Sequence, residues 1–228
     1  MKNKLLIIMV VGLLGSAAQA DLFSVTNVVN QIIPDNNSIG YVSTQNVTMT
    51  GNILTDIVVG LSISGLSGDP AFNGDYFITL QNDSGGYAVL VNRIGKTAAD
   101  EFGYDDNGMD VTFSLAGADI HTLGAAPGDG TLTGDWGVDG RVTDPNSVLD
   151  SDARTAMLDS FVNPNGEWRL FVADLSGGGR GQLDSWSLDL QAIPEPGTLG
   201  LFVMSGGTIL FFRRRWMAQS LERRLEEL

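Results

Sequence analysis

The chain has 228 residues, of which 43% are apolar and 18% charged, with no cysteine, a single histidine and a net charge of −14. The lack of cysteine excludes disulfides, thiol nucleophiles and cysteine-containing metal sites, and a lone histidine excludes any motif that needs two. An acidic pI of about 4.2 argues against nucleic acid as a partner, because that affinity comes mostly from Lys and Arg that neutralise phosphates. Residues 21–192 hold 23 acidic and six basic side chains, a net charge of −17.

The first twenty residues have the order of a secretory signal peptide. Lys2 and Lys4 come first, an apolar run over 5–14 follows, and small residues close the segment at Ala18 and Ala20. This sequence of charged, apolar and small residues is the pattern that signal peptidase processes. We therefore predict cleavage after Ala20 and export of the domain that follows.

The other end carries Pro194-Glu195-Pro196, an uncharged stretch and then Arg213-Arg214-Arg215. Residues 198–212 are predicted to form a transmembrane helix, although the stretch is short for a bilayer core of about 30 Å. Three adjacent arginines favour a span, because a buried soluble helix gains nothing from such cations at its end. The positive-inside rule keeps them in the cytoplasm, while the signal peptide places the domain on the other side.

Together, residues 193–215 resemble the PEP-CTERM sorting signal of Gram-negative bacteria, with its Pro-Glu-Pro motif, short transmembrane helix and basic cluster. The resemblance implies recognition by an exosortase at or near Pro194-Glu195-Pro196, and association with extracellular polysaccharide. It predicts an inner-membrane-anchored precursor that ends at the cell surface or in the extracellular matrix. The tail 216–228 departs from the family. It is interpreted either as an amphipathic helix on the cytoplasmic membrane surface or as an extension without a role.

Residues 21–192 are predicted to form one all-β domain. Short alternating apolar runs are separated by clusters of Gly, Asn, Asp and Ser, which is typical of strands and turns. The predicted strands are 47–54, 57–64, 75–82, 88–94, 110–115, 167–174 and 182–191, and a short helix is predicted over 152–161. Without an internal repeat, propellers and solenoids are excluded, and an antiparallel β-sandwich is the expected architecture.

The clearest part of the pattern lies near the end of this domain. Period two places Trp168, Leu170 and Val172 on one face of a strand, and Trp186 begins a matching face in the next apolar run. The Gly-rich segment 175–180 lies between them. We predict a hairpin whose inner face carries both tryptophans.

This pattern, G-x-W-x-L-x-V-x-D followed by a Gly-rich turn and G-x-L-x-x-W-x-L-x-L, resembles the carboxy-terminal part of the P domain of subtilisin-like proprotein convertases. Residues 75–80, 88–93 and Tyr104-Asp105-Asp106 follow the order of further elements of that family, whereas 82–86 replace its usual Pro-Gly-Thr turn. The resemblance implies a jelly-roll sandwich of the galactose-binding-like group with no catalysis of its own.

Several aspartates are candidate calcium ligands. Asp105, Asp106 and Asp110 lie within six residues together with Asn107, and Asp174 ends a predicted strand. Calcium takes six to eight oxygen ligands from such side chains and from loop carbonyls. The first three also coincide with an element at which the resemblance implies calcium binding. Two interpretations stay open: a calcium site, or turn formers that add solubilising charge.

Catalytic motifs are missing from the sequence. His121 has no nucleophile motif nearby and is predicted to face solvent or to pack. Paired carboxylates of a glycosidase stay an alternative, although chance pairs are expected among so many aspartates. We predict a non-enzymatic surface or matrix protein. The alternatives are an accessory to a separate subtilisin-like protease, or a carbohydrate-binding module whose stacking candidates are Tyr41, Tyr76, Tyr87, Tyr104 and Trp136.

Overall fold

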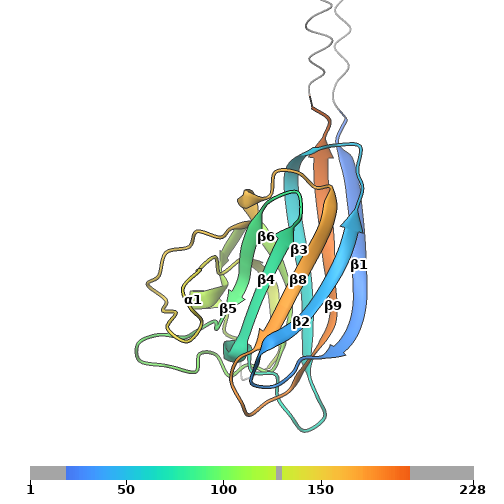
Figure 1. The fold of residues 1–228 in the computed structure, drawn as a ribbon. Helices are drawn as coiled ribbons and strands as arrows, with labels where there is room; N and C mark the ends of the chain where they lie inside the picture. The colour runs from blue at the N-terminus through green and yellow to red at the C-terminus, as the bar shows by residue number, and fades with distance from the viewer. Residues whose placement is uncertain (1–18, 127–129, 196–228) are drawn as a thin grey trace, which may run out of the picture.

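The computed structural model describes residues 19–126 and 130–195, in which two β-sheets pack face to face (Figure 1). One sheet has five strands in the order β1-β9-β3-β6-β7, and the other has four in the order β2-β8-β4-β5. The strands are β1 (Asp21–Ile32), β2 (Asn37–Val47), β3 (Ile53–Gly65), β4 (Tyr76–Asn82), β5 (Tyr87–Asn92), β6 (Met109–Asp119), β7 (Leu132–Gly137), β8 (Gly166–Asp174) and β9 (Gly181–Ile193). All paired neighbours are antiparallel except β6 and β7. The prediction of an all-β sandwich is confirmed.

Helical structure in the described residues is limited to short turns. These are α1 (Ile120–Leu123) and the 3-10 turns η1 (Asn73–Asp75) and η3 (Leu158–Ser160). No helix in residues 19–126 and 130–195 is long and apolar enough to cross a membrane. The predicted transmembrane helix 198–212 lies outside the described residues, as do Ala18, Pro196, Arg213, Arg214, Arg215 and the tail 216–228.

Alternation of apolar and polar residues builds the core. In β3, Ile57, Val59, Leu61 and Ile63 are at most 2% exposed, and the residues between them face outward. The edge strand β5 is buried along almost its whole length, because the backbone of residues 139, 140 and 156 bonds to its outer edge. These connections protect a strand edge that would otherwise be free to pair with another chain.

The two tryptophans are both in the core, but the predicted hairpin is wrong. Trp168 lies on β8 in the four-stranded sheet and Trp186 on β9 in the five-stranded sheet, at 0% and 2% exposure. The segment 175–180 therefore arches from one sheet to the other instead of joining paired neighbours. Period two identifies which side of a strand is buried, but it carries no information about the strand beside it.

Two further predicted elements differ from the structure. Residues 48–52 form a loop between β2 and β3, so a strand over 47–54 is wrong. The predicted helix 152–161 is also wrong, because the amides of Thr155 and Ala156 donate to Gly140 O at 2.8 and 2.9 Å. Amides engaged in that way are not available for a helical ladder.

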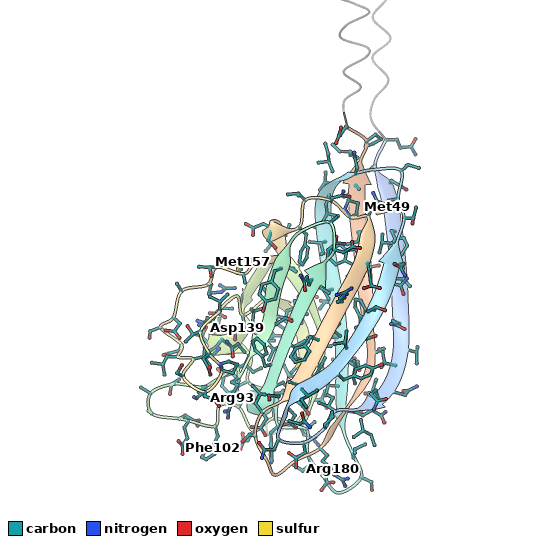
Figure 2. The ribbon with its side chains drawn as sticks, in the orientation of Figure 1. Met49, Arg93, Phe102, Asp139, Met157 and Arg180 are labelled. Carbon is teal, nitrogen blue, oxygen red and sulfur yellow. The ribbon has the colours of Figure 1, made fainter. Side chains whose placement is uncertain are left out.

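Both ends of the sandwich domain lie side by side (Figure 1). β1 and β9 are antiparallel neighbours, and Asp21 is the Cα partner of Ala192. The chain therefore enters and leaves the sandwich at the same end, where Figure 2 also places Met49.

Candidate functional site

Asp174 occupies the last position of β8, next to the arch that leads to β9. Its Cα partner on β4 is Tyr76, and its carboxylate accepts a hydrogen bond from Ser176 N at 3.2 Å. The residue is 2% exposed. Burial, reinforced by the charges of Asp75 and Asp35, raises the pKa of Asp174 to about 7 against the hydrogen bonds from Ser176 and Asn36. A buried carboxyl that titrates near neutral pH is typical of functional sites and also of structural acid clusters.

Asp75 ends η1 beside this carboxyl. Its Oδ1 lies 3.8 Å from Arg93 Nη2, and burial raises the pKa of Asp75 although Arg93 opposes the shift. A cavity of about 230 Å³ opens between Phe72, Asp75, Phe102 and Asp105. Figure 2 shows Arg93 and Phe102 on the side of the sandwich where these loops gather. Asp105 and two residues of the arch after Asp174, Ser176 and Gly177, thus line the same cavity.

The other two predicted ligands lie elsewhere. Asp106 is 3% exposed, and its Oδ2 accepts from Ala126 N at 2.7 Å. Asp110 points to solvent from β6, where it lines a depression on the outer face of the five-stranded sheet. Within the described residues, no group of three or more His, Asp or Glu side chains has the arrangement of a metal site. The four candidate ligands are therefore not brought together, and calcium stays a prediction from the sequence.

His121 was predicted to face solvent or to pack, and the structure shows that it is fully buried, so the packing alternative holds. Its Nδ1 lies 2.7 Å from Asp139 Oδ2 and its Nε2 lies 2.9 Å from Lys96 O. Arg141 bonds both Asp139 and Asp119 in the same cluster. Sequence reasoning did not detect this network, since its members are spread over more than forty residues of the chain, from Lys96 to Arg141.

The end at which both termini lie is organised by the loop 48–52. Asp21 Oδ2 accepts from Thr50 N at 2.7 Å and from Thr50 Oγ1 at 2.9 Å. Asn52 Nδ2 donates to Glu195 Oε1 at 2.9 Å, and Glu195 N donates to Asn52 Oδ1 at 3.1 Å. One loop therefore contacts both the residue that follows the predicted signal-peptide cleavage site and the central residue of the predicted sorting motif.

A groove of about 420 Å³ crosses the outer face of the four-stranded sheet. Its lining combines Val42 and Phe171 with the polar side chains of Thr44, Gln81 and Arg169. The ring of Phe171 lies over Gly40, where a Cβ would approach it to 2.9 Å. The groove could not be predicted from the apolar pattern of 167–174, because that pattern marks the core-facing positions, whereas the outward positions of the same strand line the groove.

The five aromatic candidates for sugar stacking differ in exposure. Tyr76 is 0% exposed and is wrong as a stacking residue, whereas Tyr87 is 39% exposed beside the groove strands. Tyr41, Tyr104 and Trp136 are half-buried against the core. Tyr87 is thus the one of the five that the structure leaves substantially open.

No protein-family model matches the chain, and no curated protein matches it either.

Proposed function

We propose that the protein is an exported, non-catalytic surface or matrix component, a P-domain-like jelly-roll sandwich that signal peptidase and an exosortase process. Its carboxy-terminal segment holds the precursor in the inner membrane until the sorting step, and the product is associated with extracellular polysaccharide. The observation that carries this proposal is the pairing of Asp21 with Ala192, which puts both predicted processing sites at one end of the sandwich. With both junctions at one end, the rest of the sandwich can extend away from the membrane in the anchored precursor.

The order of the strands supports the jelly-roll, galactose-binding-like assignment. The chain passes to the opposite sheet at the connections β1–β2, β2–β3, β3–β4, β5–β6, β7–β8 and β8–β9. Repeated crossing of this kind distinguishes jelly rolls from meanders, in which consecutive strands pair within one sheet.

The experiment is expression of the full chain with and without a matching exosortase, followed by intact mass and cell fractionation. We expect loss of mass at both ends and release from the inner membrane only when the exosortase is present. Glu195→Ala is expected to block the second loss, and Asp184→Ala, on the body of β9, serves as the control that loses the same charge. An anchored, uncut precursor in the presence of the exosortase would count against the proposal.

A second candidate function is carbohydrate binding on the outer face of the four-stranded sheet. The groove there sets an aromatic ring beside an amide, a hydroxyl and a guanidinium, as sugar sites do. Arg169 Nε lies 2.5 Å from Glu167 Oε1. This face therefore carries a cation that is paired with a carboxylate, although the domain as a whole is acidic.

A pull-down with the host's extracellular polysaccharide tests this candidate. We expect Arg169→Ala and Gln81→Ala to lower retention, and Thr26→Ala on the other sheet to leave it unchanged. Equal retention of all variants assigns binding to another surface, and no retention of the parent chain removes the candidate.

A further inference from the structure

The partners of His121 define which protons its ring carries. Nδ1 faces a carboxylate oxygen of Asp139 at 2.7 Å, and Nε2 faces the backbone oxygen of Lys96 at 2.9 Å. Both side chains of the His121–Asp139 pair are 0% exposed. A carbonyl oxygen can only accept a hydrogen bond, so Nε2 must donate.

The other partners of Asp139 favour a proton on Nδ1 as well. Its Oδ2 also accepts from Asn92 N at 3.1 Å, and its Oδ1 accepts from Arg141 N at 3.3 Å and from Arg141 Nη1 at 3.2 Å. The Arg141 guanidinium on Oδ1 favours the ionised carboxylate, which acts only as an acceptor. Both nitrogens of His121 are therefore donors, and only the imidazolium form has two.

We propose that His121 is a buried imidazolium in the folded protein and that its proton controls whether the flank beside β5 stays closed. The ring joins three segments: the loop after β5 through Lys96 O, the helix α1 itself, and the loop after β7 through Asp139. Gly95 N adds a backbone bond to His121 O at 2.9 Å. Figure 2 shows Asp139 on this flank, outside the strands of the sandwich.

The charged groups around the ring balance the extra proton. Asp119, at the end of β6, accepts from His121 N and from Arg141 Nη2. Asp139 and Arg141 approach from the loop after β7, and Arg154 lies 3.9 Å from Asp119. Lys96 directs its ammonium away, to Asn146 O. The network thus has two buried cations, His121 and Arg141, and two carboxylates, the buried Asp139 and the partly exposed Asp119.

The same contacts set the direction of the titration. Burial by itself lowers the pKa of His121, but the hydrogen bond and charge of Asp139 and the Lys96 carbonyl outweigh burial and the repulsion from Arg141, so the pKa is raised. A raised pKa means that the stabilisation is complete below the unfolded value of about 6.5 and is lost as pH rises through the folded value. When His121 loses a proton, the lone pair of one ring nitrogen faces an oxygen of either Asp139 or Lys96. That contact then becomes repulsive and breaks.

The single histidine makes the test direct, because every imidazole signal belongs to His121. In the full chain, labelled with nitrogen-15 histidine and kept in mild detergent, we expect both ring nitrogens to carry protons at pH 7. We also expect amide exchange at Gly95 to accelerate as pH rises beyond the intrinsic increase, and the melting temperature to fall by about 3 °C or more across the titration. A neutral, single-tautomer ring at pH 6 in the folded chain overturns the proposal.

His121→Gln supplies the comparison, since glutamine keeps a donor but does not titrate in this range. We expect its melting temperature to fall less with rising pH than that of the parent, because only the part of the fall that Asp174 causes remains. Parallel pH profiles of parent and variant also overturn the proposal. If the variant does not fold, the ring protonation of the parent decides the question alone.

Discussion

Asn52 and Glu195 hold each other through two hydrogen bonds, with the side-chain amide donating to the carboxylate and the Glu195 backbone amide donating back to Asn52 Oδ1. The pair connects the loop between β2 and β3 to the chain directly after β9. Under the proposed function, the central residue of the sorting motif is therefore bound to the folded sandwich before a protease reaches it.

Asn52→Ala is expected to speed conversion of the precursor, because the motif no longer has to leave the loop before it is cut. Two exposed hydrogen bonds contribute about 1 kcal/mol or less together, so the acceleration should be a few-fold. Pulse-chase labelling with a matching exosortase measures it, and Asn46→Ala, on the exposed side of β2, is the control. A slower conversion would show that the contact presents the motif to the protease.

Trp168→Ala is expected to lower the free energy of unfolding by about 3–5 kcal/mol, measured by urea titration. The indole is fully buried, its ring centroid lies 4.7 Å from that of Phe161, and its Nε1 donates to Pro164 O at 2.8 Å. Trp168→Phe should cost less, because it keeps part of the packing although it also loses the bond to Pro164 O. Equal losses for the two variants would assign the effect to the hydrogen bond.

Asp174→Asn is expected to stabilise the domain at pH 8 and to leave its stability nearly unchanged at pH 4. Because the pKa of Asp174 is raised to about 7, the stability that this group contributes is complete below the usual value of 3.8 and is lost as pH rises through 7. Each pKa unit corresponds to about 1.4 kcal/mol, so the gain at pH 8 should be at most about 4 kcal/mol. Urea titrations at the two pH values measure it, and a loss of stability at pH 8 would refute the assignment.

Bound calcium would reverse the pH dependence of the stability that Asp174 contributes. A bound cation stabilises the ionised form, so the sequence-based calcium prediction requires excess calcium to raise the melting temperature, and more at pH 8 than at pH 5. Asp174→Asn and Asp105→Asn should remove the rise. A parent chain with the same melting temperature in calcium and in chelator contradicts the prediction.

How well the sequence predicted each strand depends on how regularly apolar and polar residues alternate in it. Five of the predicted runs correspond to β4, β5, β6, β8 and β9, and 57–64 lies within β3. β1 and β2 escaped prediction because they carry Asn, Gln, Ser and Thr between their apolar residues, as in Thr26-Asn27 and Thr44-Gln45-Asn46. Those polar residues are accommodated by contacts between the strands, such as Asn27 Nδ2 to Ser43 Oγ at 3.0 Å, which only the folded chain reveals.

The candidate site was less accessible to prediction than the fold. Spacing alone placed Asp105, Asp106 and Asp110 together, yet one lines a cavity, one turns inward to Ala126 and one faces solvent from a strand. The raised pKa of Asp174 depends first on its burial and then on the charges of Asp75 and Asp35, which are distant in sequence. His121 was unremarkable as a lone residue, and its role follows entirely from Asp139 and Lys96.

The position of β9 determines when the domain can fold. This last strand lies between β1 and β3 in the five-stranded sheet, so it separates two strands that are made much earlier. β1 has no partner in this sheet, and β3 has only β6, until residues 181–193 have emerged, and pairing over such sequence distances is slow. The five-stranded sheet therefore completes only after the whole domain has been synthesised. Under the proposed function, this delay gives an exported chain time to cross the membrane while still unfolded.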